Sequence, residues 1–167
     1  GTAKLMSLFY TLGSIGAWNP RRASNLLDSA AHFYDSYETN DEKFITLGAI
    51  EPHFYAVMRE KMGLDDADFL KQNDPRQWPE LKQKIASVVK QKTQKQWCEI
   101  MEGTDACFAP VLDLNQAPEH HHMQARNAYI KHQGKVQPAP APKFSRTASE
   151  INDHTPMSLS EIVTAWS

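Results

Sequence analysis

The one residue whose type and surroundings suggest chemistry is Glu51, the single acidic side chain in an apolar and aromatic stretch from residue 44 to residue 55. A carboxylate there can be a site group that rigid elements hold on both sides. It can also be a helix-start carboxylate, because the helix dipole favours a negative charge at that end. The pattern alone favours the second interpretation, and both remain open at this point.

The elements that would position Glu51 are a strand before it and a helix after it. The segment from Phe44 to Ala49 is uncharged and contains β-branched and aromatic residues, as strands do. Pro52 suits the first turn of a helix, where its missing N–H costs nothing. Apolar residues then recur at helical spacing to Met62, and Gly63 suits the C-terminal cap. The sequence therefore predicts a strand-to-helix junction at Glu51.

The histidines and cysteines are weaker candidates for chemistry. His120, His121 and His122 are adjacent, and neighbouring helix positions point in different directions, so these side chains share one ion poorly. No zinc-type spacing supports them, and the sequence predicts no metal site. Cys98 and Cys107 also lack metal-ligand spacing, so a nucleophilic or redox role is open but unsupported.

Two further carboxylates, Asp28 and Asp35, flank a predicted hairpin together with Glu51. Any two of the three could meet in the fold, and the sequence leaves this open. The chain has no P-loop and no GxGxxG motif, so it predicts no cofactor-binding residues.

The composition fits one domain, with or without arms. A chain of 167 residues with 41% hydrophobic residues can form a packed core. The formal net charge of −2 gives no basic footprint for nucleic acid, and no apolar run is long enough for a membrane span. Two cysteines are a poor disulfide framework, which favours a reducing, cytoplasmic location. Because the chain starts at Gly1, we expect its N-terminus to be incomplete.

The predicted elements combine helices with short antiparallel hairpins. This order predicts an α+β fold with a small antiparallel sheet and packed helices, flanked by an N-terminal helix and a C-terminal arm. The predicted elements, in order, are helix 2–17, hairpin 33–49, helix 52–62, a short helix near 66–70, helix 78–89, helix 93–102, strand 107–112, helix 115–126, hairpin 129–137, an extended Pro-rich segment 138–142 and a capped helix from residue 158.

Several blocks resemble the α-methylacyl-CoA racemases of the family III CoA-transferase superfamily. The most specific are residues 48–55, which read GAIEPHFY, and residues 138–147, which read PAPAPKFSRT. Two positions depart from the family pattern: Ser29 begins a pair that is Gly-Gly in many members, and Glu42 replaces a turn glycine. The other matching blocks are NLLD at 25–28, FYDSYE at 33–38, WPEL at 78–81, GTDAC at 103–107 and APVL at 109–112.

The resemblance covers only the C-terminal half of such an enzyme, and implies the small domain of its fold. Family members are interlocked homodimers with an acyl-CoA substrate and no separate cofactor. Their active site lies between the large domain of one subunit and the small domain of the other. Glu51 matches the family carboxylate that supports the catalytic histidine. That histidine and a catalytic aspartate would lie in the large domain, so we expect the isolated chain to be inactive.

The resemblance divides the chain into three parts and leaves three functions open. Residues 1–25 would end the large domain, residues 26–137 would be the small α+β domain, and residues 138–167 a Pro-rich linker and arm. The first function is part of an acyl-CoA racemase of fatty acid metabolism, which moves the α-proton of a 2-methylacyl-CoA. The alternatives are a CoA-transferase of the same superfamily and a free-standing assembly module. For all three we expect a homodimer held by the N-terminal helix and the C-terminal arm, because their apolar stripes need burial.

Overall fold

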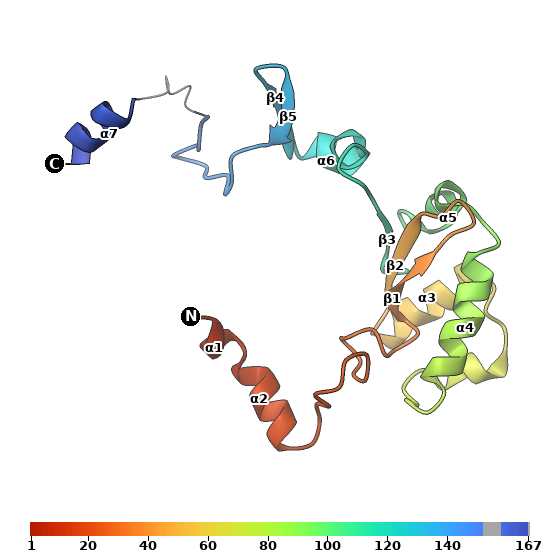
Figure 1. Ribbon diagram of the computed structural model, residues 1–167. Coiled ribbons are helices and arrows are strands. Elements are labelled where there is room, and N and C mark those ends of the chain that lie inside the picture. Colours follow the sequence, from red (N-terminus) through yellow and green to blue (C-terminus); the bar gives the residue numbers. More distant parts are fainter. Residues whose placement is uncertain (152–157, 167) are drawn as a thin grey trace. The chain divides into compact units, whose positions relative to one another are not determined.

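The computed structural model describes residues 1–151 and 158–166, and its chain forms two units (Figure 1). Unit 1 runs from Gly1 to Leu112 and unit 2 from Asp113 to Ser167. Residues 152–157 and 167, which belong to the predicted C-terminal arm, lie outside the described residues. The predicted boundaries near residues 25 and 137 stay predictions.

A three-stranded antiparallel sheet forms the centre of unit 1, with the strand order β1-β2-β3. Its strands are β1 (Tyr34–Glu38), β2 (Phe44–Gly48) and β3 (Phe108–Val111). The first two strands are the predicted hairpin, and β3 carries its proline on the edge of the sheet, as expected. Alternation along β2 buries Ile45 and Leu47 and turns Thr46 toward the opposite face.

Three helices cover one face of this sheet: α3 (Pro52–Met62), α4 (Trp78–Val89) and α5 (Gln94–Met101) (Figure 1). A 3-10 turn, η1 (Ala67–Leu70), joins the first two. Each helix buries an apolar stripe, as its spacing predicts. The buried helix residues of the core are Tyr55, Met58, Met62, Phe69, Trp78, Leu81, Ile85, Val89, Trp97 and Met101. The predicted α+β fold with a small antiparallel sheet is therefore confirmed.

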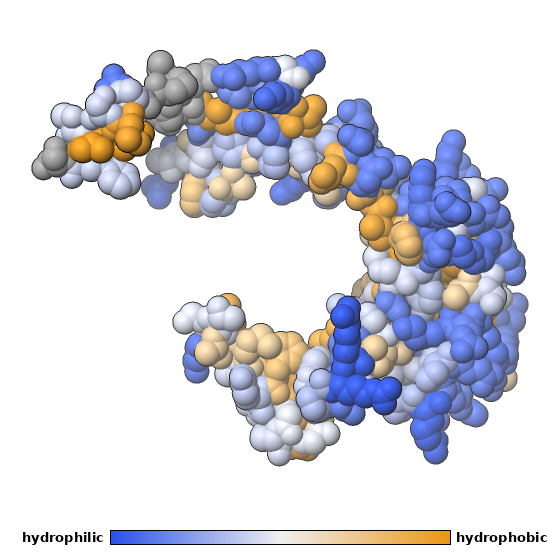
Figure 2. Space-filling model, in the orientation of Figure 1, coloured by the Kyte–Doolittle hydropathy of each residue, from blue (hydrophilic) through white to orange (hydrophobic). Residues whose placement is uncertain are grey.

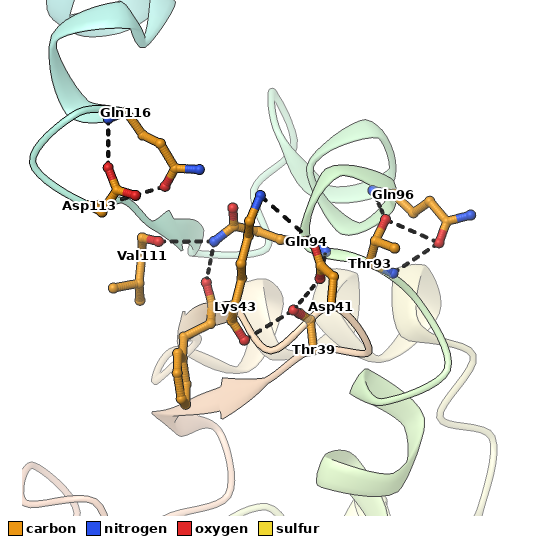
Figure 3. Close-up of polar contacts among 10 residues, drawn as sticks. Thr39, Asp41, Lys43, Thr93, Gln94, Gln96, Val111, Asp113 and Gln116 are labelled. Carbon is orange, nitrogen blue, oxygen red and sulfur yellow. Dashed lines mark hydrogen bonds and ion pairs between the residues drawn. The ribbon is translucent and has the colours of Figure 1, made fainter.

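A cluster of hydrogen-bonded polar groups around Gln94 lies at the start of β2 (Figure 3). The Gln94 side chain is 5% exposed, and its amide nitrogen donates to the carbonyls of Phe44 (2.7 Å) and Val111 (2.9 Å). The Gln94 backbone N–H donates to Asp41, which also accepts from the Thr39 hydroxyl. The predicted capping box at the start of α5 is present. One buried amide thus joins β2, β3 and α5.

Both departures from the family pattern carry positive backbone φ angles. Ser29 has φ of 74° and Glu42 has φ of 59°. Glycine adopts this left-handed region freely, whereas an L side chain is strained there. The structure therefore gives a physical reason for glycine at both positions in the pattern that this sequence resembles, and the hairpin turn keeps that geometry here.

The N-terminal segment is two short helices, where one was predicted. They are α1 (Thr2–Leu5) and α2 (Ser7–Ser14), and Met6 between them has ψ of 0° in place of a helical value. Gly16 then ends the segment with φ of 72°. Large apolar side chains along both helices are exposed (Figure 2); they are Leu5, Met6, Leu8, Tyr10 and Ile15.

Unit 2 contains a two-stranded hairpin and short helices. The hairpin, β4 (Tyr129–His132) and β5 (Lys135–Pro138), is confirmed, and Gln133 and Gly134 both have positive φ, as a two-residue turn requires. The predicted helix at 115–126 is wrong in detail, because His120 is extended and separates its two helical pieces. The helices of unit 2 are η2 (Ala117–Glu119), α6 (His121–Ala125) and α7 (Leu159–Trp166). Across the described residues, no helix is both long and apolar enough to cross a membrane.

Candidate functional site

Glu51 lies at the predicted junction, as the N-cap residue of α3. Its backbone is extended, with φ of −72° and ψ of 140°, and its carbonyl accepts the Tyr55 N–H at 2.9 Å. Pro52 occupies the first turn, and Gly63 closes the helix in the left-handed conformation, as predicted. The backbone on both sides of Glu51 is therefore regular and hydrogen-bonded.

The Glu51 side chain is exposed and makes no hydrogen bond to its own helix. Within residues 1–151 and 158–166 it also forms no ion pair. Glu51 therefore lies at the helix start, where the dipole favours a negative charge, and its exposed carboxylate makes no bond to its own helix.

Cys107 is the neighbour of Glu51 that the sequence did not identify. Cys107 is exposed, but partial desolvation of its thiol raises the pKa of that group, and the negative charges of Glu51 and Asp105 raise it further. Its carbonyl accepts the Gly48 N–H at 2.9 Å, so β3 and the end of β2 meet beside Glu51. A raised pKa keeps the thiol protonated, which argues against a nucleophilic cysteine. Cys98 is similar, because burial raises its pKa to about 11.

A shallow groove follows the uncovered face of the sheet next to this junction. Residues of all three strands line the groove, and Cys107 lies among them. The lining residues are Ser29, Tyr34, Asp35, Ser36, Thr46, Leu47, Gly48, Cys107, Phe108 and Ala109. The carboxylate among these lining residues belongs to Asp35, and Glu51 is not one of them.

The other two acidic candidates do not join Glu51. Asp28 accepts from the Asn25 backbone N–H at 2.6 Å and from its side-chain amide at 2.7 Å, which closes a local turn. Asp35 forms an ion pair with Lys82 of α4. Both carboxylates hold the fold together, and the sequence could not separate this role from a catalytic pair.

A buried polar pair beneath α3 was not predicted from the sequence. Tyr55 donates to the Phe69 carbonyl at 3.0 Å, so His32 Nε2–H donates to the Tyr55 hydroxyl at 2.7 Å. The other ring nitrogen of His32 is buried without a partner in the described part of the chain. Burial lowers the pKa of His32 to about 4, so the ring is neutral near pH 7.

The three adjacent histidines are not arranged as the sequence suggested. The expected divergence of neighbouring side chains assumed a continuous helix, whereas His120 is extended and precedes α6. The rings of His120 and His121 lie 4.4 Å apart, centroid to centroid. His122 lies on α6 and is exposed.

The sequence matches a family model described as CoA-transferase family III over residues 2–158. It is 41% identical over 148 residues to α-methylacyl-CoA racemase of Mus musculus and 38% identical over 148 residues to that of Homo sapiens. Each match covers 88% of this chain and 39% of the relative. The chain therefore spans well under half the length of the curated racemases that it matches.

Solved structures support the same fold. A crystal structure of the hypothetical protein Rv3272 from Mycobacterium tuberculosis matches with a TM-score of 0.59 over 87% of this chain and 39% of that chain. The sequence identity is 12%, so this likeness concerns the fold alone.

Proposed function

Because the chain belongs to the CoA-transferase family III, we propose that it supplies the small-domain part of an acyl-CoA racemase. The reaction moves the α-proton of a 2-methylacyl-CoA thioester from one face of the carbon to the other, within fatty acid metabolism. The observation that carries this proposal is Glu51, an exposed carboxylate on a rigid junction that its own helix does not use. The 41% identity to a curated racemase supports it.

The chemistry explains the need for a glutamate at this point. Racemisation requires acid-base groups on both faces of the α-carbon and stabilisation of the enolate between them. In the proposed enzyme the histidine comes from another polypeptide segment, and Glu51 lies beside it. A neighbouring carboxylate orients the ring and favours its protonated form. Proton transfer needs no electron carrier, so we propose acyl-CoA as substrate with no further cofactor.

The test is a chimera in which this chain replaces the part of mouse α-methylacyl-CoA racemase that it matches. We expect the chimera to epimerise 2-methylacyl-CoA and to exchange the α-proton in deuterated water, and the isolated chain to do neither. Glu51→Gln should lower kcat about 10²-fold, the lower range for acid-base catalysis, and leave CoA binding intact. Glu60→Gln, an exposed glutamate on the same helix, is the control. Equal activity of both variants would refute the role of Glu51.

A CoA-transferase is the second candidate, because the matching family model carries that name. A relative of Caenorhabditis elegans that is 27% identical over 118 residues is also named a CaiB/baiF CoA-transferase family protein. This reaction would move CoA between carboxylic acids through an aspartate outside this chain. Assaying the chimera with a free carboxylic acid acceptor separates the two: CoA transfer without epimerisation supports the second candidate.

We also propose that the chain self-associates as a homodimer in a reducing, cytoplasmic compartment. The exposed apolar side chains of α1 and α2 support this, since contiguous apolar patches mark interfaces. Sedimentation over a concentration range is the measurement. A compact monomer at high concentration that is unchanged by deleting residues 1–17 would contradict the role of α1 and α2.

A further inference from the structure

Gln72 is a buried side chain that bonds directly to the backbone before Glu51. Its side chain is 6% exposed. The amide nitrogen donates to the carbonyl of Ala49 at 3.0 Å and to that of Ile50 at 2.9 Å. Both amide hydrogens are therefore used, on the last two carbonyls before Glu51. Gln72 lies in the loop after η1, more than twenty residues further along the chain.

The Gln72 loop is itself anchored in the core. The indole N–H of Trp78 donates to the Gln72 carbonyl at 2.8 Å, and Trp78 is 8% exposed at the start of α4. A continuous set of buried bonds therefore leads from α4 through Gln72 to the junction. The bond from Gln72 to the Ala49 carbonyl is buried, so its loss would leave that carbonyl unsatisfied.

These contacts leave Glu51 little backbone freedom. Gln72 bonds the carbonyls of the two residues before Glu51, and the ring of Pro52 fixes the backbone of the residue after it. The Glu51 carbonyl itself accepts the Tyr55 N–H. The remaining freedom is in the side-chain torsions. A carboxylate that must meet a group from elsewhere benefits from such a rigid base, because misplacement by about 1 Å can cost about 10²-fold in rate.

We propose that Gln72 is a positioning residue that fixes Glu51 for its role in the acid-base chemistry. This inference rests on the proposed function, and goes beyond it by assigning the orientation of Glu51 to a residue that touches neither the substrate nor the histidine. The loop of Gln72 serves the junction through two hydrogen bonds, and α4 anchors that loop.

The chain contains a matched control in Gln94. Both glutamines are buried to the same degree, and each donates both amide hydrogens to backbone carbonyls (Figure 3 shows Gln94). Gln94 holds the start of β2 at Phe44, whereas Gln72 holds the chain just beyond its end. Gln72→Met and Gln94→Met each remove two side-chain hydrogen bonds and put in a side chain of similar volume, so the two variants should have similarly lowered Tm values. Only Gln72→Met should change the position of the Glu51 backbone.

The first measurement uses the 167-residue chain. Gln72→Met should speed amide hydrogen exchange of residues 49–51 about tenfold, the effect of losing about 1.4 kcal/mol of local hydrogen bonding. Gln94→Met should leave that segment unchanged and speed exchange around Phe44. Unchanged exchange of residues 49–51 in Gln72→Met would overturn the proposal.

The second measurement uses the chimera. Gln72→Met should lower kcat about tenfold with KM unchanged, while Gln94→Met keeps kcat at a temperature where both variants are folded. Equal losses of kcat in the two variants would overturn positioning in favour of general destabilisation. If Glu51→Gln itself keeps full activity, the proposed function fails, and hydrogen exchange still decides whether Gln72 holds the junction.

A third variant, Gln72→Glu, tests the proposal if Gln72→Met does not fold. In Gln72→Glu the protonated carboxyl can donate one bond, whereas the ionised form faces two carbonyl oxygens. Burial raises the pKa of a carboxyl, so kcat of Gln72→Glu should fall as pH rises across the neutral range. Gln94→Glu should lose stability with rising pH but keep the pH profile of kcat. A wild-type pH profile in Gln72→Glu would contradict the proposal.

Discussion

Strand β2 is held by a buried glutamine at its start and by another just beyond its end, and the two ends differ in what lies next to the glutamine. At the Gln94 end, the neighbouring carboxylate of Asp41 accepts from Thr39 and from the Gln94 backbone. At the Gln72 end, the neighbouring carboxylate of Glu51 is exposed and its own helix leaves it unbonded. At both ends a buried glutamine donates two hydrogen bonds to backbone carbonyls.

This difference separates a structural end from a candidate functional end. A polar group that serves only stability finds its partners within the fold, because an unused acceptor gains nothing. Glu51 has a fixed backbone and an exposed carboxylate, which fits the proposed partner from another polypeptide segment. The comparison therefore distinguishes Asp41 and Glu51, which the sequence presents as similar acidic residues next to turns.

The largest effect should come from breaking the structural end. Trp97 is 1% exposed on α5, the helix that begins with Gln94, and its indole N–H donates to the Val89 carbonyl at 2.9 Å. Trp97→Ala should lower the free energy of unfolding by about 3–5 kcal/mol, through lost burial and a cavity. Urea unfolding of the chain measures this. A loss below about 1 kcal/mol would show that α5 does not hold this end.

Acid should weaken the end near Glu51, because His32 bonds to Tyr55 in α3. The folded pKa of about 4 lies below the ordinary 6.5, so the unfolded state binds more protons between these values and stability rises with pH. Stability should fall by on the order of 2–3 kcal/mol as pH drops from 6.5 through 4. Urea titrations at several pH values test this. His32→Gln, which does not titrate here, should remove that part of the slope.

Relieving backbone strain should stabilise both ends by a similar, smaller amount. Glu42 lies in the hairpin turn beside Asp41, and Ser29 lines the groove on the uncovered sheet face, both with positive φ. Glu42→Gly and Ser29→Gly should each raise the free energy of unfolding by up to about 1 kcal/mol. Ser36→Gly, in regular strand β1, should instead destabilise. Destabilisation by all three glycines would show that strain is absent at the two turns.

The smallest expected change in the free energy of unfolding, that of Glu51→Gln, gives the clearest contrast between the two ends of β2. Glu51→Gln should change the free energy of unfolding by less than about 0.5 kcal/mol, because its carboxylate makes no bond within its helix. Asp41→Asn, at the other end, should cost about 1–2 kcal/mol, because it disturbs two accepted hydrogen bonds. Chemical unfolding of both variants gives the contrast. Equal losses of unfolding free energy in the two variants would show that Glu51 has a structural role.

The sequence by itself determined the features that depend on nearby residues. The hairpin of β1 and β2, the start of α3 at Pro52 with its end at Gly63, and the capping box of α5 were all predicted, because turns, caps and periodicity act over a few residues. The place of Glu51 follows from the same signals. Its strand and helix leave that residue at the junction whatever the rest of the chain does.

The tertiary structure alone decided which distant groups meet there. Gln72 reaches Ile50 across 22 residues and Gln94 reaches Phe44 across 50, while Cys107 comes beside Glu51 only when β3 pairs with β2. No pattern in the sequence marks these partners. A loop glutamine looks the same whether its amide faces water or two carbonyls, and only packing of the helices against the sheet removes the water and makes the choice.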